Sequence, residues 1–197
     1  MTQSPSKPVL MSSPVNWLQL IRLPNLATAA ADPLAGFLVV GGFGTYSSLP
    51  LVGWLVIASS LCLYAGGMVQ NDVVDFEIDH VERPFRPLPS GRVSREVAGL
   101  VAGALLVFGV AFACVASAYV NKMAPACLGV TLAAAICCYN RYAKGTRWGP
   151  MVMGGCRSLN WSLGMVAAGS PSLPMWMIPC GVGVYVGGIT LFAHDEV

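Results

Sequence analysis

The chain has 197 residues, of which 55% are hydrophobic and only 10% are charged, and its formal net charge is +2. A typical soluble domain is roughly a quarter charged, so these charges are too few to cover a water-soluble protein of this length. We therefore expect one domain embedded in the lipid bilayer, without a nucleic-acid partner.

The first 13 residues are polar and rich in Ser and Pro, which predicts a disordered cytoplasmic tail without a cleavable signal peptide. Residues 14–197 are then expected to form a single transmembrane bundle. Six apolar segments follow in chain order, at about 17–40, 50–69, 97–120, 123–139, 151–168 and 173–192. Each approaches the roughly 20 residues that a membrane helix needs. Because backbone groups in lipid must be paired internally, the predicted fold class is an all-α, multi-helix transmembrane bundle.

The positions of Lys and Arg predict the orientation of the bundle. Basic residues lie at the front and in alternate connections, at Lys7, Arg22, Arg83, Arg86, Arg92, Arg95, Arg141, Lys144 and Arg147. The opposite set of connections holds only Lys122. The positive-inside rule predicts a multi-pass protein of the inner or plasma membrane, with its termini and both basic loops in the cytoplasm.

The first apolar segment contains an acid, Asp32, followed by Pro33. An ionisable group inside a membrane helix is a functional candidate, and the proline could kink the helix and release a backbone carbonyl. The alternative is a packing residue that hydrogen-bonds a neighbouring helix, and the sequence leaves both open.

An acidic stretch, QNDVVDFEID, comes directly after the second apolar segment. Asp72, Asp75 and Asp79 are spaced three and four residues apart, which places the carboxylates on one face if the helix continues. Three like charges there repel one another unless a cation lies between them. Mg²⁺ is the natural candidate, because it binds carboxylates and keeps room for water and phosphate oxygens.

Four arginines follow the acids, at Arg83, Arg86, Arg92 and Arg95. Guanidinium groups bind phosphate in a planar, bidentate manner, so acids and arginines together suit a diphosphate bridged by metal. The alternative is a solvated loop of paired charges. Acids at the C-terminal end of a helix are unfavourable, and this favours the functional interpretation.

The pattern NDVVDFEID followed by RPFRPLPSG resembles the first aspartate-rich motif of UbiA-type prenyltransferases. The resemblance implies that Asp72 and Asp75 are catalytic. It also implies a Mg²⁺–diphosphate site that consists of Asn71, Asp72, Asp75 and Asp79 as metal ligands, with Arg83 and Arg86 at the phosphates.

A second stretch, YNRYAKGTRWGPMVMGGCRSLNW, resembles the family's segment between its fourth and fifth helices. The resemblance implies a catalytic Lys144 and diphosphate contacts from Tyr139 and Arg157. Arg22 and Asn25 match a front-end pattern of the family, and Asn25 is expected at the diphosphate. Arg157 lies inside an apolar segment, where it needs a polar cavity or a partner; Lys144 could instead be an ordinary positive-inside charge.

The resemblance covers nearly the whole chain, but the family fold has nine helices and two facing aspartate-rich loops. Here about six helices are expected, so the bundle is incomplete at the C-terminus, and Asp195 and Glu196 stand where the second motif would begin. Three alternatives stay open: a fragment, a homo-oligomer that closes the cavity, or lost catalysis. The segment GPMVMGGCRSLN is more similar to the EboC-like branch, whose acceptor cannot be inferred.

The predicted function is Mg²⁺-dependent transfer of a prenyl group from a prenyl diphosphate to an aromatic or other acceptor within the membrane. The enzyme would be a prenyltransferase, moving an alkyl group other than methyl. The alternative is an inactive or fragmentary membrane protein that binds prenyl lipid or a partner.

Overall fold

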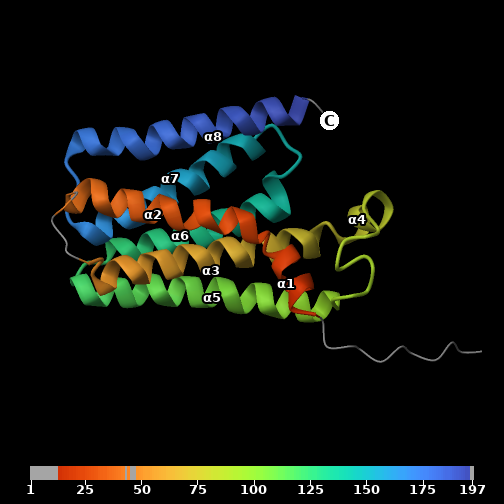
Figure 1. Ribbon diagram of the computed structural model, residues 1–197. Coiled ribbons are helices and arrows are strands. Elements are labelled where there is room, and N and C mark those ends of the chain that lie inside the picture. Colours follow the sequence, from red (N-terminus) through yellow and green to blue (C-terminus); the bar gives the residue numbers. More distant parts are fainter. Residues whose placement is uncertain (1–12, 43, 45–47, 196–197) are drawn as a thin grey trace, which may run out of the picture.

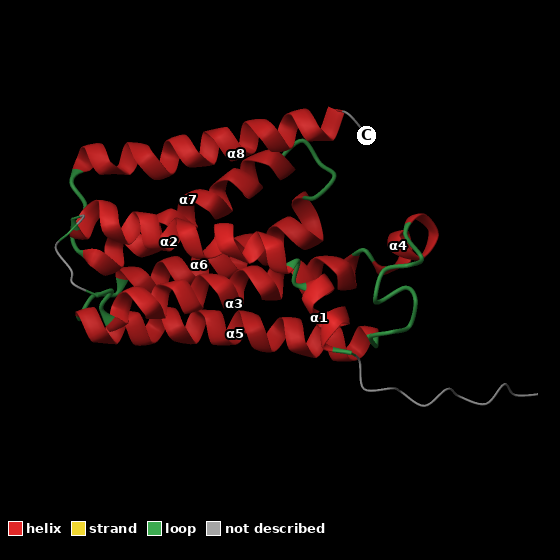
Figure 2. Ribbon diagram, viewed as in Figure 1, coloured by secondary structure: helices red, strands yellow, loops and turns green. Residues whose placement is uncertain are grey.

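The computed structural model describes residues 13–42, 44 and 48–195, and this part of the chain contains helices and no strands (Figure 2). The α-helices are α1 (Pro14–Leu20), α2 (Leu26–Gly41), α3 (Leu51–Val74), α4 (Phe76–Glu82), α5 (Arg95–Val120), α6 (Ala124–Cys138), α7 (Gly149–Ala168) and α8 (Met177–Asp195). Three short turns are η1 (Leu23–Asn25), the π-helical η2 (Tyr139–Ala143) and η3 (Leu173–Trp176). The all-α prediction is confirmed. The predicted tail lies outside the described residues except for Ser13.

The six long helices coincide with the six apolar segments, but only four described helices are long and apolar enough to cross a membrane. These are Leu23–Gly41, Leu51–Val74, Arg95–Val120 and Leu173–Phe192. The expected number of long helices is confirmed, and α6 and α7 are the two that do not meet this criterion. The reason is that α6 has 15 residues before the π turn begins, whereas α7 carries Arg157, Asn160 and two serines.

Helix α3 lies at the centre of the bundle, with α2, α5, α6 and α7 packed around it (Figure 1). Helix α8 packs mainly against α7 and leaves most of its surface outside the bundle. One core cluster joins α2, α3, α5 and α7 through Phe37, Val56, Ala113 and Leu163, which are each 0–1% exposed. Burial of these side chains against one another fixes the positions of the helices that carry the polar residues.

Two glycines allow α2 and α7 to approach closely. A Cβ on Gly36 would lie 2.2 Å from the carbonyl oxygen of Trp161, and a Cβ on Gly164 would lie 1.9 Å from that of Pro33. Neither backbone oxygen can move aside, so only glycine permits this approach at either position. The crossing brings Asp32, one turn before Gly36, opposite the middle of α7.

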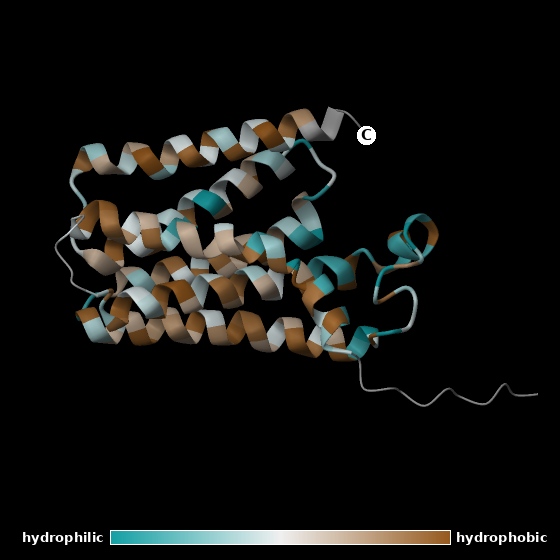
Figure 3. Ribbon diagram, in the orientation of Figure 1, coloured by the Kyte–Doolittle hydropathy of each residue, from teal (hydrophilic) through white to brown (hydrophobic). Residues whose placement is uncertain are grey.

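Polar residues gather at one end of the bundle, around α4, the loop after it and the start of α5 (Figure 3). The loop is tied to the bundle by a second core cluster, in which Leu88 and Val93 pack with Leu20, Val69 and Ala98. Helix α5 begins at Ser94, whose hydroxyl accepts a hydrogen bond from the Val97 N–H at 3.2 Å. The loop and its arginines are therefore held against the end of α3.

Candidate functional site

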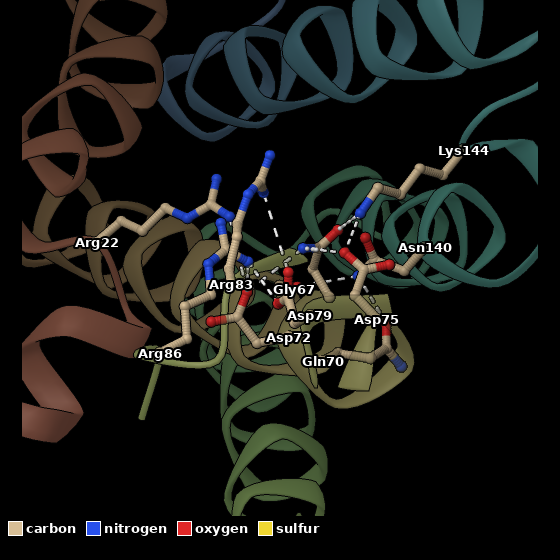
Figure 4. A network of polar contacts seen from close by, with 11 residues as sticks. Arg22, Gly67, Gln70, Asp72, Asp75, Asp79, Arg83, Arg86, Asn140 and Lys144 are labelled. Atoms are coloured by element: carbon tan, nitrogen blue, oxygen red, sulfur yellow. Dashed lines mark hydrogen bonds and ion pairs between the residues drawn. The ribbon is translucent and has the colours of Figure 1, made fainter. Parts of the chain in front are cut away.

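The acidic residues lie where α3 ends and α4 begins (Figure 4). Asn71 and Asp72 are buried in the last turn of α3, and Asp79 in α4 is only 2% exposed. Helix α3 ends at Val74 and α4 begins at Phe76, so Asp75 stands between the two helices. Because the chain bends at Asp75, the three carboxylates do not share one continuous helical face as expected, but divide into two neighbouring groups.

The first group joins Asp72 and Asp79 to three arginines. Arg86 Nη1 lies 2.6 Å from Asp79 Oδ2 and 3.6 Å from Asp72 Oδ1, so that one guanidinium bridges both acids. Arg22 Nη2 lies 3.6 Å from Asp72 Oδ1, and Arg83 Nη1 lies 4.0 Å from Asp79 Oδ1. Two buried carboxylates are thus held together by positive charge, which offsets their mutual repulsion.

The second group joins Asp75 to Asn71 and Lys144. The Asn71 amide donates to Asp75 Oδ2 at 3.1 Å, and Lys144 Nζ donates to Asn71 Oδ1 at 2.9 Å. Lys144 also forms an ion pair with Asp75, from 69 residues away in the sequence. The ammonium group therefore contacts two residues, Asn71 and Asp75, that the family resemblance implies as metal ligands.

Lys144 reaches this position from the π turn η2. Its backbone N–H donates to the carbonyl of Tyr139 at 2.9 Å, five residues earlier, which closes the wide turn. The Asn140 amide ties the turn to α3, donating to Gly67 O at 2.9 Å and to Gln70 Oε1 at 3.0 Å. Single π turns inside helices occur frequently at functional sites, and this one directs Lys144 toward the end of α3 (Figure 4).

Arg157 and Asn25 lie apart from both groups. Arg157 makes two contacts with Asp32, Nη1–Oδ2 at 2.8 Å and Nη2–Oδ1 at 2.9 Å, inside the bundle. Asn25 is exposed at the start of α2. The expected diphosphate contacts of these two residues stay predictions, as do those of the other site residues. The Asp195 side chain and Glu196 lie outside what the structure describes.

Two hollows adjoin the charged groups. An open cleft of about 360 Å³ lies beside Asp72 and is lined by Gln19, Arg22, Asp72, Phe85, Arg86, Pro87 and Arg92. A narrower, mostly apolar cavity of about 100 Å³ runs between α3, α6 and α7. Gly67 and Tyr139 line its end near Lys144, and Ser60 and Asn160 line its other end. A charged cleft next to an apolar cavity suits an amphiphile with an anionic head.

The oxygen atoms at the end of α3 are of the types that Mg²⁺ prefers. The Asn71 amide nitrogen lies 3.5 Å from Asp72 Oδ1 and 3.1 Å from Asp75 Oδ2, so both carboxylates approach one amide group. Among the described residues, no three His, Cys, Asp or Glu side chains are grouped closely enough to hold a metal by themselves. The donor set fits Mg²⁺ if phosphate and water oxygens supply its remaining ligands.

Several residues of these networks were not singled out from the sequence as site residues. Arg22 was noted only as part of a front-end pattern, yet it contacts Asp72. Gln70 and Asn140 carried no sequence signal of their own, because uncharged amides at helix ends are ordinary. Their contribution depends on the packing of η2 against α3, which local sequence does not report.

Comparison with protein families matches residues 32–196 to the UbiA prenyltransferase family. Among curated proteins, a digeranylgeranylglyceryl phosphate synthase of Saccharolobus solfataricus is 38% identical over 105 residues, covering 53% of this chain and 36% of that protein. The enzyme of the same name from Methanoculleus marisnigri is 37% identical over 113 residues, covering 54% and 39%. The aligned region thus spans well under half of these relatives. The expected EboC-like branch is not confirmed by these matches.

Solved structures resemble the fold over most of this chain. One of them has a TM-score of 0.77 at 27% identity and covers 88% of this chain and 60% of the other. It comes from work on digeranylgeranylglyceryl phosphate synthase in membranes. A UbiA homolog from Archaeoglobus fulgidus bound to GPP and Mg²⁺ has a TM-score of 0.70 at 18% identity, covering 92% and 65%. A structure of a UbiA homolog from Archaeoglobus fulgidus bound to DMAPP and Mg²⁺ has a TM-score of 0.67, also at 18% identity, covering 83% and 58%.

Proposed function

The chain belongs to the UbiA prenyltransferase family, whose members are integral membrane proteins, and on this premise we propose that it carries the diphosphate half of a prenyl-transfer site. The proposed reaction is Mg²⁺-dependent transfer of a prenyl group from a prenyl diphosphate to an acceptor within the membrane. The observation that carries the proposal is the meeting of Asn71, Asp75 and Lys144 beside the Arg22–Asp72–Arg86 group.

In this proposal, the arginines of the open cleft bind the diphosphate oxygens. Arg22, Arg86 and Arg92 line that cleft, and their guanidinium groups favour the charge that grows on the departing diphosphate. Asn71, Asp72 and Asp75 hold Mg²⁺, with Asp79 in support through Arg86. The bound metal would neutralise the leaving diphosphate as a Lewis acid.

Lys144 is proposed to act at the junction of cleft and cavity. Its ammonium group now contacts Asn71 and Asp75, and it would turn toward the diphosphate when Mg²⁺ takes its place on these oxygens. The apolar cavity below it, next to Tyr139, would take the start of the prenyl chain. Exclusion of water from this cavity would protect an allylic cation from hydrolysis.

The acceptor proposed for the first tests is the one that leads to a digeranylgeranylglyceryl phosphate, the product named for the relatives above. It is supported by 38% identity over 105 residues, about half of this chain. An aromatic acceptor is the second choice. Self-association of the chain stays a prediction.

The proposed orientation places the charged end of the bundle in the cytoplasm. Of the basic residues outside the helices, those in the loop before α5 and near η2 lie at this end, whereas Lys122 lies at the other, hydrogen-bonded to Ser170 at 3.1 Å. This distribution agrees with the positive-inside rule.

The proposal is tested by thermal unfolding of the purified chain with geranylgeranyl diphosphate, with and without Mg²⁺. A ligand that binds only the native state at 100 times its Kd adds about 2.7 kcal/mol of stability, so we expect a clear rise in Tm that requires Mg²⁺. Asp72→Asn should abolish it. Glu77→Gln is the matched control, because Glu77 is an exposed acid of α4 that pairs only with Arg95 among the contacts described.

A shift that is absent in the unmodified chain, or unchanged in Asp72→Asn, would contradict the proposal. The alternative is a non-catalytic protein in which the acidic and basic side chains only form ion pairs with one another. The direct pairing of Asp79 with Arg86 and of Asp75 with Lys144 favours this alternative. The two differ in one outcome: only the enzyme releases diphosphate when donor, Mg²⁺ and acceptor are present together.

A further inference from the structure

A backbone carbonyl in α2 is released by a proline. Pro33 has no N–H, so the carbonyl of Ala29, four residues earlier, lacks its usual helical partner. Ser60 Oγ of α3 donates to this carbonyl at 2.7 Å, and Asn160 Nδ2 of α7 lies 3.3 Å from it. The released carbonyl therefore draws polar side chains from two other helices to one buried point.

The contacts of Asn160 determine which way its amide faces. Its Nδ2 also donates to Asp32 Oδ2 at 3.1 Å. Both partners are acceptors, so the nitrogen must face them and the oxygen must face away. Asn160 is 6% exposed, and its Oδ1 has no hydrogen-bond partner in the part of the chain that the structure describes. Buried oxygens of this kind normally have a donor, which is missing here.

Asn160 lines the apolar cavity between α3, α6 and α7, together with Arg157 and Ser60. Most of the remaining wall is apolar, with Leu63 and Leu132 among the lining residues. Ser60 lies three helical turns, about 16 Å, before Asn71 along α3. This end of the cavity is therefore separate from the charged groups where the diphosphate is proposed to bind.

The charge at this end of the cavity is already balanced. Arg157 and Asp32 form a two-contact ion pair at 2.8 and 2.9 Å, so the site offers no net positive charge to an anion. A guanidinium has five N–H donors, and the two contacts with Asp32 leave others available. Asn160, whose Oδ1 is an unpaired acceptor among the described residues, and Arg157, which keeps donors beyond its contacts with Asp32, both line this cavity.

We propose that this end of the cavity is a binding subsite for a neutral hydroxyl group on an apolar body, such as a prenyl or other long-chain alcohol. The hydroxyl hydrogen bonds Asn160 Oδ1, and its oxygen accepts from Arg157. A fully ionised phosphate lacks the hydrogen that Asn160 requires, and an ether or hydrocarbon lacks it as well. The subsite goes beyond the proposed transfer reaction and needs neither diphosphate nor Mg²⁺.

The test compares geraniol with geranyl methyl ether, which has the same apolar body but no hydroxyl hydrogen. Thermal unfolding of the full chain is followed over a concentration series of each, in EDTA and without diphosphate. We expect geraniol to bind about tenfold more tightly than the ether, as one hydrogen bond to an otherwise unpaired buried group implies. Asn160→Leu should remove this preference.

Met153→Leu is the control, because Met153 lines the same cavity with an apolar side chain and the change leaves Asn160 in place. The preference for geraniol should persist in this variant. Equal affinity for alcohol and ether in the unmodified chain would overturn the proposal, since water alone would then satisfy Asn160. A preference that survives Asn160→Leu would overturn it too. The unmodified chain decides the first point even if the variants fail to fold.

Discussion

Replacement of Asn140 by Ala is predicted to release Lys144 from the end of α3. Asn140 is 5% exposed and makes two hydrogen bonds, to Gly67 O at 2.9 Å and Gln70 Oε1 at 3.0 Å. Each such bond contributes about 0.5–1.5 kcal/mol, so the variant should loosen the turn by about 1–3 kcal/mol. That range corresponds to roughly a 5- to 150-fold increase in the population of the released turn.

The assay is pulse labelling with an amine-reactive reagent, read by mass spectrometry. Lys144 is held by Asn71 and Asp75, whereas Lys122 lies at the other end of the bundle on Ser170. Labelling of Lys144 should rise in Asn140→Ala, by at most the factor given above, while labelling of Lys122 should not change. The ratio of the two lysines within one molecule removes differences in reagent and protein concentration.

Ser59→Ala supplies the control for general destabilisation. Ser59 is fully buried and donates one hydrogen bond to Gly109 O at 2.7 Å, far from the π turn. It should lower Tm without altering the ratio of Lys144 to Lys122 labelling. If Asn140→Ala remains folded with an unchanged ratio, then Asn140 does not hold Lys144 in place, and the role inferred for the π turn is wrong.

Three further changes test the packing and the charges of the bundle. Gly164→Ala should destabilise the chain by about 1–3 kcal/mol or more, because the new Cβ meets an immobile backbone oxygen. Gly155→Ala, with nothing within 4 Å of its Cβ, should leave the urea midpoint unchanged or raise it, because alanine is more favourable than glycine inside a helix. Asp32→Leu should lower the free energy of unfolding by an amount near the lower end of about 3–5 kcal/mol, since Arg157 loses its buried partner but has a side chain that is 25% exposed. Adding Arg157→Met should restore most of this stability, as measured by thermal unfolding. If the second change restores none of it, the ion pair between Asp32 and Arg157 is not what Asp32→Leu removed. Ser94→Ala should cost about 1 kcal/mol through loss of the α5 N-cap, visible as faster hydrogen exchange in the first turn of α5.

Much of the fold was predictable because hydropathy is a local property. Six apolar stretches mark the six long helices, and no packing information is needed to find them. The prediction failed where a helix ends for a tertiary reason. The bend at Asp75 and the π turn after Cys138 are not visible in apolar periodicity, because each is stabilised by contacts with another helix.

The acidic and basic residues of the site were predictable as a set, since Asp72, Asp79 and Arg86 are close in sequence and any ordered turn brings them together. The place of Lys144 rested on the resemblance to a family, and its contact with Asp75 depends on how η2 packs. The spacing of residues along the sequence could not have shown whether Lys144 contacts Asp75 or is an ordinary charged residue of a loop.

The sequence by itself determined that the chain is a membrane bundle and that Asp32 and Arg157 each require a partner, because an ionisable group in an apolar segment is costly alone. Only the tertiary structure decided that they are each other's partner, across 125 residues. The reason is the close crossing of α2 and α7 at Gly36 and Gly164. The charge of each side chain shows that it needs a partner in the bundle, but helix packing determines which residue lies close enough to be that partner.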